Sequence, residues 1–250
     1  MFAALFTAGF FLLLTVKAVV LALACGVAAV ASMLLWMRES DPPPAGTVDV
    51  GGGVRLPTYA SGPDSHSWWA MIVLILVAAA LYLSYLFGYL YLWTVAPQQW
   101  PGRDHLPQAG WGWASLLLMA GSAGSLFSAH RLLGTDRLRG GALALVVAAG
   151  IAALLSALGL DLWSHWRAGL RPQASGFTAM VYANAVLQAQ LAAAIVVMAG
   201  FAIYRVLTDK LDQVRRIVFD NLALLWSYAI GQGLIGLALT HGFPRLVGAP

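Results

Sequence analysis

Residues 68–95 read WWAMIVLILVAAALYLSYLFGYLYLWTV and contain no charged side chain. A helix that crosses a membrane needs about 20 consecutive, mostly apolar residues, so this stretch is long enough to span a bilayer. Four later segments meet the same test: residues 112–131, 140–161, 177–206 and 218–240. The sequence therefore predicts a body of five transmembrane helices.

The composition is typical of a chain surrounded by lipid. Charged residues make up 10% of it and apolar residues 60%, against about 25% charged residues in ordinary soluble domains. The mean hydropathy of +0.78 leaves too little polar material for a water-facing exterior. The Lys and Arg residues stand singly or in small groups between apolar runs, which indicates membrane topology and argues against nucleic-acid binding.

The first 37 residues are too many for one straight membrane span. At 1.5 Å per residue they would extend about 55 Å, whereas the hydrocarbon core is about 30 Å thick. We therefore predict a two-helix N-terminal hairpin over residues 1–37 with a turn near Lys17. A cleavable signal peptide is the alternative, but the run lacks a basic start and continues directly into more apolar sequence.

Residues 38–67 differ from their surroundings because they are rich in proline, glycine and charge. Such composition predicts an extramembrane linker, which separates the hairpin from a five-helix bundle over residues 68–250. The predicted fold class is an all-α integral membrane protein with seven transmembrane helices in a 2+5 arrangement. The short later connections predict antiparallel packing of sequential helices.

The distribution of Lys and Arg predicts the orientation, because these residues are more frequent on the cytoplasmic side. With seven spans, one side carries Arg38, Arg55, Arg131, Arg137, Arg139, Arg205, Lys210, Arg215 and Arg216. The other side carries only Lys17, Arg103, Arg167, Arg171 and Arg245. The prediction is a cytoplasmic N-terminus and an external C-terminus. A single span over residues 1–37 would leave the orientation of the later helices unchanged.

The ionisable residues predict neither a redox metal site nor a proton relay in this chain. A haem or copper centre needs ligands that converge from helix interiors, and no HxxxH or CxxC spacing occurs. The histidines are expected at helix ends or in loops, as interfacial residues: His66, His105, His130, His165 and His241. The carboxylates, Asp161 and Asp220 included, are likewise expected in loops or at membrane boundaries. We therefore predict no catalytic, cofactor or metal-binding residue.

Four amides fall at membrane depth in the last two spans: Asn184, Gln188, Gln190 and Gln232. Amides in apolar surroundings usually form interhelical hydrogen bonds, and this is the predicted role; a ligand site or proton path is the alternative. Small residues at helical spacing predict close helix contacts at Gly121 with Ser125, and at Gly236 near Gly231 and Gly233.

Three interfacial residues are candidates for binding phospholipid headgroups: Trp69, Trp93 and Arg205. Aromatic rings and arginines at membrane boundaries suit headgroups. Simple anchoring of helix ends at the interface is the alternative reading.

Three blocks of the sequence resemble one known family. They are SHSWWA at 65–70 with YLFGYLYLWTVAP at 85–97, then FDNLALLWSY at 219–228 with GQGLIGLALTHGFPRL at 231–246, and VDVGGGVRLPTYASGP at 48–63. These blocks are similar to subunit III of the haem-copper cytochrome c oxidases, and most similar to the subunit III portion of bacterial oxidases in which subunits I and III are fused. That family has a seven-helix form divided into two and five helices.

The resemblance implies a non-catalytic subunit of a proton-pumping oxidase in a bacterial cytoplasmic membrane. The complex passes electrons from cytochrome c to oxygen, with haem and copper held by subunits I and II. Subunit III packs on subunit I, holds phospholipid and supports proton uptake and stability. This chain departs from the family where a carboxylate is common midway along the third span, since residues 77–80 are apolar, and where histidines are usual, since Gln190 and Ser227 stand there.

Other functions are compatible with the sequence. A quinol oxidase or nitric oxide reductase would use a similar subunit. A secondary transporter would show inverted repeats and broken helices, and no internal repeat is evident. A membrane scaffold unrelated to respiration is a third possibility, favoured only by the missing carboxylate and histidines.

Overall fold

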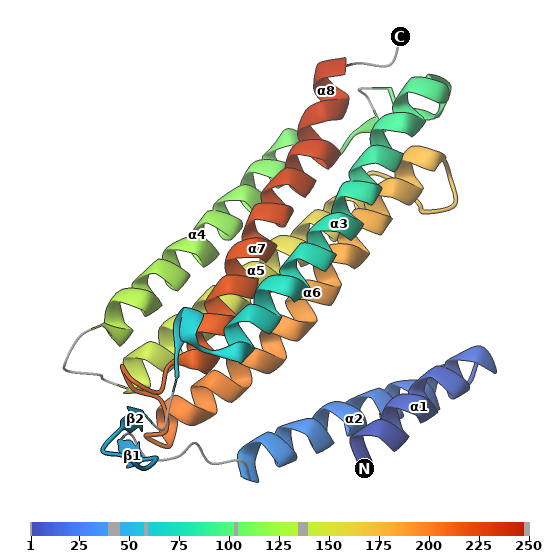
Figure 1. The fold of residues 1–250 in the computed structure, drawn as a ribbon. Coiled ribbons are helices and arrows are strands. Elements are labelled where there is room, and N and C mark those ends of the chain that lie inside the picture. The colour runs from blue at the N-terminus through green and yellow to red at the C-terminus, as the bar shows by residue number, and fades with distance from the viewer. Residues whose placement is uncertain (1, 40–45, 58–59, 103–104, 135–139, 248–250) are drawn as a thin grey trace. The chain divides into compact units, whose positions relative to one another are not determined.

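The computed structural model describes residues 2–39, 46–57, 60–102, 105–134 and 140–247 of the chain (Figure 1). The chain divides into two compact units, Met1–Tyr59 and Ala60–Pro250, which we describe separately. Parts of the predicted linker, residues 40–45 and 58–59, lie outside the described residues, as do Arg103, Arg137 and Arg139 of the orientation argument.

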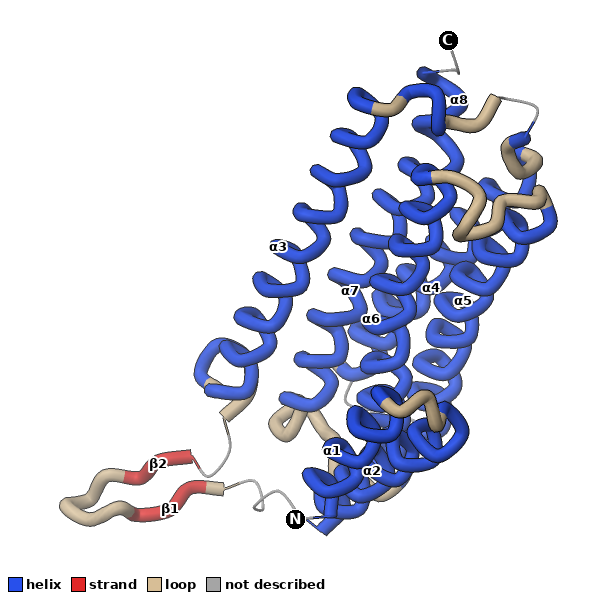
Figure 2. Tube along the Cα trace, turned by 90° about the vertical axis from the view of Figure 1, so that its right-hand side faces the viewer, coloured by secondary structure: helices blue, strands red, loops and turns tan. Residues whose placement is uncertain are grey.

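The first unit contains a helical hairpin and a β-hairpin. Helix α1 (Phe2–Thr15) packs against α2 (Val19–Glu39), and the chain reverses through Lys17, whose φ is +60°. Strand β1 (Thr47–Asp49) pairs antiparallel with β2 (Arg55–Pro57), drawn in red in Figure 2. Positive φ angles at Gly51, Gly52 and Gly53 make the tight turn between them. This β-hairpin lies within the predicted linker, where no strand was expected.

The second unit is a bundle of five long helices. They are α3 (His66–Val95), α4 (Ala109–Leu133), α5 (Gly140–Arg167), α6 (Gly176–Leu207) and α7 (Ile217–Leu237). Short 3-10 turns η1 (Gly62–Asp64) and η2 (Pro97–Gln99) flank α3. The last rod continues from α7 through a π-helical turn, η4 (Ala238–Gly242), into α8 (Phe243–Val247) (Figure 1).

The chain is an all-α protein of the multi-pass membrane type. Among the described residues, six helical segments are long and apolar enough to cross a membrane: Val19–Trp36, the helices α3 to α6, and Ile217–Val247. Large apolar side chains point outward from them; Phe87 is 71% exposed and Leu145 is 73% exposed. The predicted seventh span is not confirmed: α1 has 14 residues and extends about 21 Å at 1.5 Å per residue.

The interior of the bundle is organised around Trp226 of α7, which is fully buried. Its indole Nε1 donates a hydrogen bond of 2.8 Å to the hydroxyl of Ser122 on α4. Its ring lies against Gly150 of α5, where a built Cβ would be 2.5 Å from the indole. A second, aromatic cluster closes one end of α3, with Tyr89 and Trp100 packed against Phe177 of α6. The two clusters fix α3 to α7 as one packed body.

Candidate functional site: a buried aspartate and two histidines

The structure brings three ionisable side chains together inside the bundle. Asp161 and His165 lie four residues apart on α5, so they share one face of that helix. His241 comes from η4, the π-helical turn that follows α7. Single π-helical turns insert an extra residue into a helix and are frequent at functional sites. All three residues are buried, with exposed fractions of 6%, 0% and 6%.

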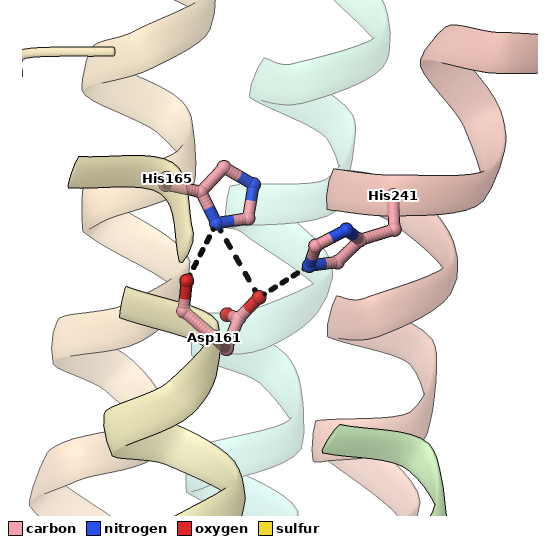
Figure 3. Close-up of side chains that lie close together, drawn as sticks. All are labelled: Asp161, His165 and His241. Atoms are coloured by element: carbon pink, nitrogen blue, oxygen red, sulfur yellow. Dashed lines mark hydrogen bonds and ion pairs between the residues drawn. The ribbon is translucent and has the colours of Figure 1, made fainter. Parts of the chain in front are cut away.

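The carboxylate of Asp161 is the centre of this cluster (Figure 3). Its Oδ1 lies 2.7 Å from Nε2 of His241 and 3.4 Å from Nδ1 of His165. Nδ1 of His165 is also 2.8 Å from the backbone oxygen of Asp161. The two imidazole rings are close to each other, with centroids 4.7 Å apart.

Burial makes the negative charge of the Asp161 carboxylate unfavourable. A carboxylate removed from water is unfavourable unless donors or positive charge compensate it, and here both donors are imidazoles. The outer nitrogen of each ring, Nε2 of His165 and Nδ1 of His241, has no hydrogen-bond partner among the described residues. The cluster can therefore hold a proton shared between three groups, or a cation in place of protons.

Two hollows adjoin the cluster. A groove of about 260 Å³ is lined by His241 together with Gly112, Trp113 and Arg245. A second, smaller cavity of about 20 Å³ is lined by Asp161, Asn184 and Gln188, among others. The smaller cavity has room for a water molecule, which needs about 10–15 Å³ by this measure, and its lining is polar enough to bind one.

Three of the four predicted amides form a polar line beside this cavity. The hydroxyl of Tyr82 on α3 is 3.1 Å from Oδ1 of Asn184, and Nε2 of Gln188 donates to the backbone oxygen of Ala229 at 2.9 Å. Gln232 donates to Gln188 through a longer contact of 3.4 Å. These bonds connect α3, α6 and α7.

Gln190 does not take part in this polar line. Its side chain is exposed, because its position on α6 turns it away from the packed face that carries Gln188. The interhelical contact predicted for Gln190 is therefore not made within the described part of the chain.

The residues proposed to bind lipid do not form one site. Trp69 and Trp93 lie near opposite ends of α3. The indole of Trp69 donates to the backbone oxygen of Pro63, while Trp93 packs edge-on against Phe243. Arg205, in the last turn of α6, is buried, with its guanidinium 4.9 Å from the ring centroid of Phe201.

The carboxylate of Asp161, expected in a loop or at a membrane boundary, is instead buried on α5 beside His165 and His241. The two histidines do lie near helix ends, but α5 continues six residues beyond the predicted end at residue 161, which places Asp161 within the packed bundle. Asp220, in the first turn of α7, is buried as well and pairs with Arg216 at 3.1 Å. Three other carboxylates, Asp41, Asp104 and Asp136, lie outside the described residues.

One signal in the sequence could have pointed to this cluster. An Asp and a His four residues apart face the same way on a helix, and this spacing occurs at residues 161 and 165. The third member could not be found this way, because His241 is 80 positions from Asp161.

Comparisons with known proteins do not identify a family for this chain. No protein-family model matches the chain, and no curated protein matches it.

Proposed function

We propose that this chain is a non-catalytic subunit of a respiratory terminal oxidase, equivalent to subunit III of the haem-copper cytochrome c oxidases. It would pack on subunit I, hold phospholipid and stabilise the complex, with haem and copper in subunits I and II. The chain would lie in a bacterial cytoplasmic membrane, with its N-terminus on the inside and its C-terminus on the outside.

The observation that carries this proposal is the packing of the two longest resembling blocks. The stretches at 65–70 and 85–97 form the two ends of α3, and those at 219–228 and 231–246 form most of α7, η4 and α8. In the structure the two run side by side. The hydroxyl of Tyr89 donates to the backbone oxygen of Leu239 at 2.6 Å. Residues that resemble one family thus contact one another across about 150 positions of sequence.

The exposed apolar surface also favours a role that depends on lipids and partner subunits. Side chains along α3 such as Leu76, Val77 and Phe87 are more than half exposed. The midpoint of α3 carries no carboxylate. We therefore propose structural and lipid-holding roles, without a carboxylate-dependent step in proton uptake.

Purification of the native complex tests this proposal. The chain is tagged at one terminus, extracted with a mild detergent, and its co-purifying chains and haems are identified by mass spectrometry and absorption spectroscopy. We expect a haem-bearing subunit I, a copper-binding subunit II and oxygen uptake driven by reduced cytochrome c. Oxygen uptake from quinol without a copper-binding subunit would instead indicate a quinol oxidase. Isolation of the chain without a haem-bearing partner would overturn the assignment.

A further inference from the structure

We propose that Asp161, His165 and His241 form a binding site for a divalent transition-metal ion, with Zn²⁺ as the best fit. This site is separate from the proposed oxidase role, which requires no metal in this chain. Four features of the cluster support it: the types of ligand, the distances between them, the contacts that hold them in place, and the hollows beside them.

The donor set is one that zinc takes. Two imidazoles and one carboxylate provide three ligands and leave a fourth position for water, as in many zinc sites with an open coordination position. The unit that holds the cluster, Ala60–Pro250, contains no cysteine. Nitrogen and oxygen ligands favour Zn²⁺ over soft ions such as Cu⁺, which prefer sulfur.

The distances from Asp161 to the two histidines are close to those of a tetrahedral site. One ligand atom from each of the three residues can be chosen so that all lie within 4.8 Å of one another. Bonds of 2.0–2.2 Å to a tetrahedral zinc ion place ligand atoms about 3.3 Å apart. Nδ1 of His165 is 3.4 Å from Oδ1 of Asp161; to bind an ion it would release its proton and its 2.8 Å contact with the backbone oxygen of Asp161. Nε2 of His241 is 2.7 Å from the same oxygen, so it needs to move by only about 0.6 Å to reach the tetrahedral spacing.

The surrounding structure holds the ligands in place. A Cβ built on Gly112 of α4 would lie 2.9 Å from Cγ of His241, so only glycine lets the ring sit where it does. The guanidinium of Arg245 donates to the backbone oxygens of His241 and Pro107, which ties the π-helical turn to the chain before α4. Support of this kind orients metal ligands and raises affinity.

The hollows beside the cluster provide a place for a fourth ligand. His241 forms part of the wall of the 260 Å³ groove, so one ligand of the cluster borders a hollow. The 20 Å³ cavity touches Asp161, beside Asn184 and Gln188. A water molecule bound there could complete the coordination and hydrogen-bond to the amides.

Metal analysis of the full-length chain tests the inference. The chain is purified in detergent, stripped with a chelator and titrated with Zn²⁺ against a chromophoric competitor. We expect about one tightly bound Zn²⁺ per chain, and a visible absorption band typical of tetrahedral coordination when Co²⁺ replaces it. We also expect Zn²⁺ to raise the unfolding temperature, because a ligand that binds the folded state stabilises it.

Variants separate this site from adventitious binding. Asp161→Asn and His241→Gln should weaken Zn²⁺ binding by at least about 10-fold and abolish the Co²⁺ band. The matched control is His66→Gln, which removes an exposed histidine at the start of α3 and should leave both unchanged. If a ligand variant fails to fold, X-ray absorption at the zinc edge of the wild-type chain decides, since it distinguishes imidazole ligation from oxygen-only ligation.

Two results would overturn the inference. One is a wild-type chain that binds no more Zn²⁺ than His241→Gln does, and the other is equal loss of binding in the His66→Gln control. Either would leave the cluster as a hydrogen-bonded contact between α5 and η4. Elemental analysis measures zinc separately from iron and copper, so failure here and failure of the oxidase proposal are distinguishable.

Discussion

Gly150 sets how closely α5 approaches α7 and α4. A Cβ at this position would lie 2.5 Å from the ring of Trp226 and 2.6 Å from Cβ of Ser125. We expect Gly150→Ala to reduce the free energy of unfolding by about 1–3 kcal/mol, because a fully buried tryptophan cannot move aside without repacking. Unfolding in detergent, followed by circular dichroism, measures this.

The matched control lies on the same helix. A Cβ at Gly159 would meet nothing within 4 Å, so Gly159→Ala should be neutral or stabilising by about 0.5–1 kcal/mol. Equal destabilisation by the two substitutions would contradict the role given to Gly150.

The amides of α6 provide a second comparison between neighbouring positions. Asn184→Ala removes the buried contact with Tyr82, and we expect it to reduce the free energy of unfolding by about 0.6–2 kcal/mol. Gln190→Ala, on the exposed face of the same helix, should change it little. If Gln190→Ala reduced the free energy of unfolding as much as Asn184→Ala, the difference in exposure would not explain the roles of the two amides.

Individual residues could be predicted from the sequence only where a local rule applies. Asn184 and Gln188 were expected to form interhelical hydrogen bonds, and they do. The small-residue rule was right for Gly233 and Gly236, which face Met119 and Asn184, but wrong for Gly121 and Gly231, which meet open space. Helical spacing shows which residues share a face, but not which face is packed.

At the scale of single elements, the start of α6 is fixed by a capping box. The hydroxyl of Ser175 accepts from the backbone N–H of Thr178, and the Thr178 hydroxyl accepts from the backbone N–H of Ser175. Ser175→Ala should reduce the free energy of unfolding by about 1 kcal/mol, because one orphan N–H loses its acceptor. Ser128→Ala, which removes an exposed mid-helix hydroxyl bonded to Gly124, is the control and should have a smaller effect in the same unfolding assay.

The connection between α6 and α7 carries a pH-dependent contribution. Partial burial would raise the pKa of Asp212, but hydrogen bonds from Arg215 and from the backbone N–H of Val214 outweigh it and hold the pKa below its usual value. A lowered pKa in the folded state means that the stabilisation is present above the unfolded-state pKa and is lost as pH falls through the folded value.

Asp212→Asn should therefore reduce stability near neutral pH and bring the variant and wild-type curves together in acid. Melting temperatures measured from neutral to acid pH test this, with Asp64→Asn as a control at an exposed carboxylate of η1. A difference between Asp212→Asn and wild type that stays constant down to strongly acid pH would contradict it.

The ends of the helices were the least predictable feature of the elements. Hydropathy falls at Asp161, so the predicted span ended there, yet α5 continues to Arg167. The carboxylate of Asp161 lies beside His165, one turn further along the same helix. Because the predicted span ended at Asp161, Asp161 and His165 were not predicted to lie together inside the bundle.

At the scale of the whole molecule, the fold class follows from the scarcity of charge. Backbone polar groups in lipid must be satisfied within the chain, so long apolar runs can only be helices. Such runs identify the helices α3 to α7 without knowledge of their contacts. The convergence of α5 and η4 on one aspartate depends on packing between distant segments, for which the sequence has no local signal.

The orientation of the bundle is the remaining prediction at this scale. The α6–α7 connection is flanked by Arg205, Lys210, Arg215 and Arg216, whereas the α5–α6 connection has Arg167 and Arg171 beside it. Since positive residues are retained on the cytoplasmic side, the α6–α7 connection should face the cytoplasm. Replacing the single cysteine, Cys25→Ser, gives a background for Gln213→Cys and Gln173→Cys, two exposed positions in these connections. A membrane-impermeant thiol reagent added to intact cells should label only Gln173→Cys, and permeabilised cells should label both. Because α3 to α7 keep this orientation whether α1 crosses the membrane or not, the reverse labelling pattern would contradict the charge argument itself and not the number of spans.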